Sequence, residues 1–194
     1  PAETVVSTLP LPLMFDILDP APPMEILQKA RGIRFRKLLL CVFCLKRGRF
    51  SENASIYFPE KEFPFTRLYE CKNRSPFVAP ENQTAIVLEL PCHESSDYWH
   101  MSDADILRNT LSALSDVDNI EQEEIIQTAV FRLPFAYPIL TVGVDQAVSE
   151  LVTYLEGFEN LHLIGRNATF RYLHTHDLFS TAETLIRQCR LSEQ

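Results

Sequence analysis

The sequence predicts an α+β fold with a mostly antiparallel central sheet flanked by helices. Strand candidates run together in the middle of the chain, between residues 33 and 90, and helical periodicity lies on either side of them. Strands that follow one another in this way favour antiparallel pairing over alternating parallel units. The 194 residues, 46% of them hydrophobic and 23% charged, are enough to bury a sizeable core.

The beginning of the chain predicts a strand followed by two short helices. Residues 4–9, TVVSTL, are rich in β-branched residues, and prolines follow them. We expect a helix over residues 13–18 and a second one from Pro23 to about Ala30, because proline is favoured in the first helical turn. Gly32 then ends the second helix.

Four strands are expected next. Residues 33–46 carry a near-continuous apolar centre, which is typical of a strand that is central in a sheet or buried on both faces. Residues 55–58, 66–72 and 84–90 are three further strand candidates, and the prolines between them occupy loop positions. These strands form the predicted sheet.

The second half predicts two amphipathic helices separated by a strand. Ser102 is a good N-cap for a helix with acidic residues in its first turn. Residues 124–133 read as a strand, and the prolines within 134–138 indicate a loop. A second helix covers residues 145–155, and Gly157 closes it.

Composition and charge exclude several classes of partner. A net charge of -8 argues against a nucleic-acid surface and against an anionic membrane surface. No run of about 18 apolar residues occurs, so we expect no membrane span. The first residues lack the basic start and apolar centre of a secretion signal, which favours a cytoplasmic location. They read like mid-protein sequence, and we expect the chain to be an excised part of a longer protein.

The five cysteines are expected to be free thiols, because nothing indicates secretion. Cys41 and Cys44 form a Cys-x-x-Cys pair. A redox or zinc pair normally sits in a turn or at a helix start, whereas this one lies inside an apolar strand. Buried packing is therefore the preferred interpretation.

Residues 160–177, NLHLIGRNATFRYLHTHD, give the strongest indication of a binding function. An apolar strand over 161–164 runs into Gly165, and a polar loop carrying Arg171 and Tyr172 leads to a helix. Such a turn leaves backbone N–H groups free for an anionic or electron-rich ligand. Glycine suits the turn because a side chain would collide with the ligand or with the turn itself. The alternative is an ordinary strand-to-loop glycine.

His174, His176 and Asp177 could be read as ligands for zinc or iron. We predict no metal site, because the two imidazoles should point apart at a helix start and no distant further ligand is evident. The alternative role for Asp177 is that of a helix cap or first-turn acid.

The closing segment resembles the C-terminal flavin-contacting motif of FAD-dependent enzymes of the amine-oxidase and UDP-galactopyranose mutase type. Three other stretches agree with that family in order and spacing. VVSTLPLP at 5–12 resembles the strand that leaves the flavin domain, residues 55–80 resemble the substrate-domain strand pair, and Ala136-Tyr137-Pro138 resembles a tyrosine–proline step. The run LHTHD at 173–177 departs from the Asn-Asn-x-Asp-His of relatives, which leaves the substrate and the reaction open. No Gly-x-Gly-x-x-Gly is present to dock a dinucleotide.

The resemblance implies a set of cofactor contacts. Gly165 and Arg166 would lie near the flavin ribityl chain and pyrophosphate. The helix that begins around His176 would direct its N-terminus at the N1–C2=O edge of the flavin. Arg171 would reach the flavin or a substrate phosphate with two parallel hydrogen bonds. The implied cofactor-binding residues are Gly165, Arg166, Arg171, Tyr172, His176 and Asp177.

A substrate groove is expected on the predicted sheet. Arg67 and Tyr69 are two residues apart and so share one face of a strand. With Asn73 they could line the groove, and in mutase-like relatives such arginines meet nucleotide-sugar phosphates. The resemblance adds Tyr137 to the substrate-binding residues. The alternative for this strand is a solvated face with surface ion pairs.

We therefore expect residues 1–194 to form a single excised domain. Residues 10–140 would bind substrate, and residues 141–194 would return to contact a separate N-terminal FAD-binding domain. The parent would resemble UDP-galactopyranose mutase, with a nucleotide-sugar substrate and a role in lipopolysaccharide or cell-envelope polysaccharide biosynthesis. The alternatives are an amine-oxidase- or protoporphyrinogen-oxidase-like FAD oxidoreductase and a non-catalytic binding module.

The chain alone is expected to be inactive and to bind FAD weakly or not at all. A nanomolar site needs ~12 kcal/mol of binding free energy. One helix end supplies only about 0.3–1 kcal/mol of it.

Overall fold

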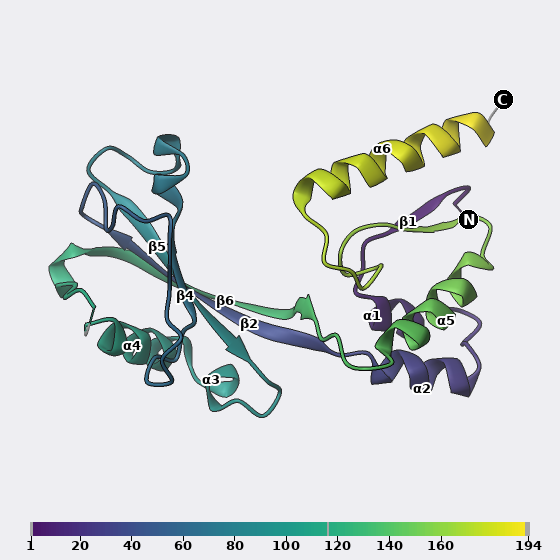
Figure 1. Ribbon diagram of the computed structural model, residues 1–194, viewed down its shortest axis with the longest axis horizontal. Helices are drawn as coiled ribbons and strands as arrows, with labels where there is room; N and C mark the ends of the chain where they lie inside the picture. Colours follow the sequence, from purple (N-terminus) through teal and green to yellow (C-terminus); the bar gives the residue numbers. More distant parts are fainter. Residues whose placement is uncertain (1, 116, 193–194) are drawn as a thin grey trace. The chain divides into compact units, whose positions relative to one another are not determined.

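The computed structural model describes residues 2–115 and 117–192 (Figure 1). The chain forms two compact units, one of residues 2–35 with 137–192 and the other of residues 36–136. We call them the terminal unit and the sheet unit. Among the described residues, no helix combines the length and the hydropathy that a bilayer span requires. The units divide near 35 and 136, and the roles expected for residues 10–140 and 141–194 stay predictions.

The sheet unit is built on five strands in the order β3-β4-β5-β2-β6. β2 pairs antiparallel with β5, β5 with β4, and β4 with β3, so the predicted mostly antiparallel sheet is confirmed. The strands are β2 (Phe35–Leu45), β3 (Ser55–Tyr57), β4 (Arg67–Glu70), β5 (Thr84–Cys92) and β6 (Ile125–Pro138).

The predicted loop at 134–138 is wrong. β6 continues through Pro134 and ends only at Pro138. β6 is an edge strand, and there a proline without an N–H breaks no ladder hydrogen bond when its nitrogen faces outward. An edge strand can therefore contain a proline, and Pro134 does not end β6.

Helices cover one face of this sheet. α4 begins where the sequence predicts, because the backbone N–H of Asp105 donates to the Ser102 hydroxyl at 3.2 Å. Leu39 and Phe43 of β2 belong to the same buried cluster as Ile106 of α4. The helical segments of the unit are α3 (Asp97–His100), α4 (Asp103–Leu114) and three 3₁₀ turns, Cys71–Asn73, Pro76–Val78 and Gln122–Glu124.

Packing explains the cysteine pair in β2. Cys41 is fully buried in the core, whereas Cys44, three residues on, lies on the opposite face of the strand. Burial raises the pKa of the Cys41 thiol to about 12, which keeps it neutral. The four cysteines with described side chains are free, as predicted.

The terminal unit has its own core. Phe15, Leu151, Leu155 and Phe170 are buried together in it. The first predicted helix begins slightly earlier than expected, since its proline fits the first turn. The elements are β1 (Val5–Ser7), α1 (Leu11–Asp16), α2 (Met24–Gly32), α5 (Val144–Glu156), β7 (Leu161–Leu163) and α6 (Thr175–Ser192).

β1 and β7 form a two-stranded parallel sheet in the terminal unit, with Val5 opposite Leu161 and Ser7 opposite Leu163. α5 and α6 lie on opposite sides of this strand pair (Figure 1). The arrangement places the end of β7, and the turn that follows it, beside the start of α6.

Candidate functional site

Gly165 begins a tight turn at the end of β7. Its φ angle is +92°, a conformation that side chains rarely adopt. A Cβ at this position would lie 3.8 Å from the Thr8 side chain, which is an ordinary contact. Backbone conformation, rather than the expected collision within the turn, therefore requires glycine. Thr169 closes the turn by donating its backbone N–H and its hydroxyl to the Gly165 carbonyl, at 3.1 and 2.8 Å.

Phe170 ends the turn in a left-handed conformation that the sequence does not signal. Its φ angle is +51°, unusual for a residue other than glycine, and costs of order 1–2 kcal/mol. The ring is buried and meets the ring of Phe35 edge-on, with centroids 5.1 Å apart. Core packing thus holds the strained residue and directs the chain that follows, Arg171 and Tyr172.

Arg166 lies against two tyrosine rings. Its guanidinium carbon is 4.5 Å from the ring centroid of Tyr137 and 4.9 Å from that of Tyr172. The two rings are nearly parallel, at 17°, with centroids 6.1 Å apart. The Tyr172 hydroxyl donates to the Pro138 carbonyl at 3.3 Å, which ties this cluster to the end of β6. The fold therefore brings Arg166, Tyr137 and Tyr172 together, and we call them the Arg166 cluster.

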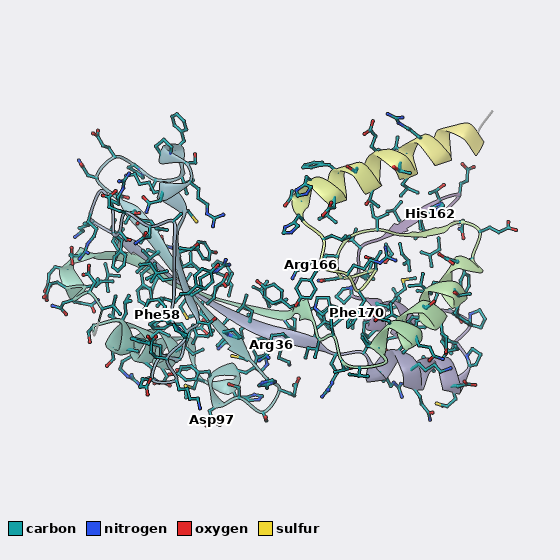
Figure 2. The ribbon with its side chains drawn as sticks, viewed as in Figure 1. Arg36, Phe58, Asp97, His162, Arg166 and Phe170 are labelled. Carbon is teal, nitrogen blue, oxygen red and sulfur yellow. The ribbon has the colours of Figure 1, made fainter. Side chains whose placement is uncertain are left out.

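Two donors of Arg166 have no acceptor. Nε and Nη2 are buried and make no hydrogen bond to any residue that the structure describes. Buried polar groups nearly always have a partner, and a buried unpaired donor costs about 1–3 kcal/mol. A carbonyl or anionic oxygen at the guanidinium edge would satisfy these two donors of Arg166, which is labelled in Figure 2.

The remaining predicted cofactor residues, Arg171, His176 and Asp177, make contacts within the chain. Arg171 is exposed, and its backbone N–H donates to the Arg166 carbonyl at 3.0 Å. The Asp177 carboxylate accepts from the backbone N–H of His174 at 2.8 Å, so it caps α6, which is the alternative the sequence left open. The rings of His174 and His176 lie parallel with centroids 5.5 Å apart, and the expected divergence is wrong.

No group of three or more His, Cys, Asp and Glu side chains that could hold a metal ion is found among the described residues.

On the sheet unit, Arg67 is engaged by an acid that sequence reasoning missed. Its Nε and Nη2 donate to the two carboxylate oxygens of Glu89 at 2.9 and 2.5 Å. Glu89 stands directly opposite Arg67 on β5, and its side chain is only 12% exposed. This fork raises the pKa of Arg67 above its ordinary value, so the residue stays charged. The presence of Glu89 inside the apolar run 84–90 is the sequence feature that could have indicated this ion pair.

Tyr69 and Asn73 differ in their relation to Arg67. The Tyr69 ring centroid lies 5.4 Å from the Arg67 guanidinium, consistent with one shared strand face. The Asn73 amide instead donates to the carbonyls of Ser51 at 2.6 Å and Asn53 at 2.9 Å. Asn73 therefore holds the loop between β2 and β3, and none of these hydrogen bonds involves Arg67. Tyr137, the fourth predicted substrate residue, belongs to the terminal unit.

Comparison with known proteins gives similarity of fold. No family model matches the sequence, and no curated protein matches it. A solved structure described as reduced UDP-galactopyranose mutase aligns with a TM-score of 0.73 at 16% identity, covering 88% of this chain and 37% of that chain. A putative protoporphyrinogen oxidase from Exiguobacterium sp. 255-15 aligns with a TM-score of 0.74 at 18% identity, covering 100% of this chain and 42% of that one. The chain thus spans about two fifths of the length of these structures.

Proposed function

We propose that this chain is the substrate-binding and C-terminal part of an FAD-dependent enzyme of the UDP-galactopyranose mutase type. Both solved structures named above carry names from the flavoenzyme group that the sequence resembles. The similarity in fold supports a flavoenzyme-like part, and the partial coverage fits a protein whose dinucleotide-binding half lies outside these residues. The finer assignment rests on the Arg166 cluster.

The buried, unpaired donors of Arg166 are the observation that carries the proposal. FAD offers oxygens of the required kind, on its pyrophosphate, its ribityl chain and its ring carbonyls, so the residues present fit the group. The rings of Tyr137 and Tyr172 contact the guanidinium and would hold its orientation when the cofactor binds. When bound, the flavin would supply the redox or nucleophilic chemistry. The chain would bind and orient it.

Magnitudes favour Arg166 over the start of α6 as the main contact. A helix N-terminus contributes about 0.3–1 kcal/mol toward a nearby negative charge. Hydrogen bonds to a charged group contribute about 1.5–3 kcal/mol each. Asp177 already occupies the first turn of α6 with its own carboxylate, which weakens the helix end further as an anion site.

The proposed substrate is a nucleotide sugar. Its diphosphate would compete with Glu89 for Arg67 on the sheet unit. Turnover of such a substrate would place the enzyme in lipopolysaccharide or cell-envelope polysaccharide synthesis. A protoporphyrinogen-oxidase-like oxidoreductase is the second candidate, favoured by an alignment that covers the whole of this chain.

Flavin binding tests the proposal. The reading frame that encodes this chain should carry a Gly-x-Gly-x-x-Gly upstream, and its full product should purify with FAD. Arg166→Ala should weaken FAD binding roughly 10- to 100-fold, because charge-assisted hydrogen bonds are lost. Flavin fluorescence titration measures this. Arg187→Ala is the matched control, since Arg187 is exposed on α6 and pairs with Glu183.

A full-length product that binds no flavin would contradict the proposal, as would an Arg166→Ala variant with unchanged affinity. Turnover of UDP-galactopyranose only under reducing conditions would support the mutase. Substrate-dependent flavin reduction would support the oxidoreductase, and neither activity would favour a binding module.

A further inference from the structure

The turn after β7 ends in a pattern that usually requires glycine. The Arg171 N–H donates to the Arg166 carbonyl at 3.0 Å, five residues earlier in the chain. Phe170, the residue before Arg171, has a φ angle of +51°. This is the Schellman arrangement that commonly ends a helical turn, in which glycine or asparagine normally occupies the left-handed position. Phenylalanine therefore stands at a position for which its own backbone preference is unsuited.

The ring of Phe170 explains how the left-handed backbone is tolerated. It is 4% exposed and meets the Phe35 ring edge-on, with centroids 5.1 Å apart. Burial of the ring offsets the cost of the positive φ. It does not require that φ, because Phe15 is buried in the same core from an ordinary position in α1. A reason for the left-handed backbone must therefore lie in the chain that follows it.

A right-handed residue 170 would carry the chain away from Arg166. Six residues along a continuing α-helix correspond to a rise of about 9 Å and a rotation of about 120° around the axis. A side chain at position 172 could then not lie against the Arg166 guanidinium. In the structure the guanidinium carbon is 4.9 Å from the Tyr172 ring centroid. The reversal at Phe170 brings Tyr172 back to Arg166 (Figure 2 labels Arg166 and Phe170).

No other residue of the turn can make this reversal. Gly165 precedes both Arg166 and Tyr172, so its φ of +92° sets where the turn begins and not the distance between those two. From Arg166 to Tyr172, a segment that the structure describes throughout, Phe170 is the one residue with a positive φ. The hydrogen bond from the Tyr172 hydroxyl to the Pro138 carbonyl holds the far end of a side chain that the backbone has already turned.

We propose that Phe170 is a positioning residue for the cofactor site: its left-handed backbone places Tyr172 against Arg166, and its buried ring holds that backbone. This inference rests on the proposed function, because it concerns how Arg166 is presented to the flavin. The Nε and Nη2 donors of Arg166 are buried and unpaired, so the direction of the guanidinium decides whether cofactor oxygens reach both of them. Phe170 itself touches no ligand and acts through the two other side chains.

Four substitutions separate the backbone of residue 170 from its ring, in the full product of the reading frame. All four remove the ring. Phe170→Gly and Phe170→Asn tolerate a positive φ, whereas Phe170→Ala and Phe170→Val disfavour it. We expect flavin affinity within about threefold of the wild type for the first two variants, and roughly tenfold weaker for the last two. Flavin fluorescence titration measures this.

The matched pair Phe170→Asn and Phe170→Val gives the sharpest comparison, because a purely structural role predicts the opposite order. Valine is apolar and suits a core position, whereas asparagine would bury a polar amide there. Stability may therefore favour Phe170→Val while flavin affinity favours Phe170→Asn. The smaller pair, Phe170→Gly and Phe170→Ala, repeats the comparison should the larger side chains prevent folding.

The Arg166 Nε–H resonance reports the position of the guanidinium directly. The guanidinium lies against two tyrosine rings, whose ring currents displace this resonance. In the full product without flavin, labelled with ¹⁵N on arginine, it is the displaced signal that is lost in Arg166→Lys. It should stay in place in Phe170→Asn and move toward the position of an exposed arginine in Phe170→Val. Phe15→Leu, the control, removes a ring from the same core and should leave the signal unmoved.

A double variant tests whether residue 170 acts through Arg166. With Arg166→Ala already present, Phe170→Val should weaken flavin binding by less than about twofold further, since no guanidinium remains to be positioned. Losses that simply add in the double variant would overturn the positioning role.

Equal flavin affinity and an equally displaced Arg166 signal in Phe170→Asn and Phe170→Val would also overturn it, as would tighter binding in Phe170→Val. A wild-type full product that binds no flavin, while its Arg166 signal follows the expected order, would overturn the proposed function and support the positioning role. Flavin binding that is weakened in Arg166→Ala but identical in the four variants at residue 170 would do the reverse.

Discussion

Two arginines of this chain differ in what surrounds their charge. Two nitrogens of the Arg67 guanidinium donate hydrogen bonds to the two carboxylate oxygens of Glu89. Arg166 has two aromatic faces and no acceptor for two of its buried nitrogens. Arg67 is therefore satisfied by the fold, whereas two buried donors of Arg166 have no partner among the described residues.

Removing the acid from the first pair should destabilise the sheet unit. Glu89→Gln leaves the guanidinium of Arg67 largely shielded and short of one charged acceptor. We expect the free energy of unfolding to fall by about 1–3 kcal/mol, less than for a fully buried pair because Arg67 retains some solvent contact. Urea unfolding followed by circular dichroism measures this.

Glu52→Gln is the matched control, because Glu52 pairs with Arg49 at the surface, where its side chain is 87% exposed. Exposed pairs contribute little, so this variant should change stability by less than about 0.5 kcal/mol. Equal losses of unfolding free energy in the two variants would show that the Arg67–Glu89 pair stabilises the protein no more than an exposed pair does.

At the scale of the element, α4 begins at a side-chain cap. The Ser102 hydroxyl accepts the backbone N–H of Asp105 and also donates to the Asp105 carboxylate at 2.6 Å. Ser102→Ala removes both interactions, and we expect a loss of about 1 kcal/mol in the unfolding of the sheet unit. Thermal or urea unfolding reports it.

Ser112→Ala makes the same chemical change in an exposed part of the same helix. Alanine has the higher helix propensity, so this variant should be neutral or slightly more stable. A comparable loss of stability in both variants would show that the Ser102 cap is not the cause of the loss.

Elements with a local signal could be predicted from the sequence, and contacts across the fold could not. Ser102 marked its helix because a cap acts on the next few residues, and the apolar run in β2 marked a central strand. The Arg67 pair escaped because its partner is 22 residues away and is set by strand register. Phe170 escaped because core packing imposes its positive φ against its own preference.

The Arg166 cluster was predicted in part. The sequence predicts Arg166 and Tyr172 as cofactor-binding residues and Tyr137 as a substrate-binding residue. It does not predict that the three side chains contact one another. Their meeting depends on the turn after β7, which brings Arg166 to the end of β6. Asn73 was nominated from proximity in sequence, and its amide serves a loop instead.

At the scale of the whole molecule, the two units have separate hydrophobic cores. The chain enters the sheet unit along β2 and leaves it along the neighbouring β6. The Ile139 N–H donates to the Arg34 carbonyl at 3.0 Å just outside that unit, so the two connections run side by side. Because both connections leave the sheet unit at the same place, this unit can be expressed without the rest of the chain.

We therefore expect residues 36–136 to fold when expressed alone. The fragment keeps its whole buried cluster, and its ends come from adjacent strands. Circular dichroism with urea unfolding should show one cooperative transition. A gradual, non-cooperative loss of signal would show that this unit needs the rest of the chain.

The proline in β6 has a consequence for how this protein meets others. Pro134 has no N–H, so the longest strand, at one edge of the sheet, carries one backbone donor fewer than a strand without proline. The rim of β7 has no such interruption, since Leu163 keeps its amide there. The longer of these two edge strands is thus the less regular template for chance pairing, and the three-residue β7 is the more regular one.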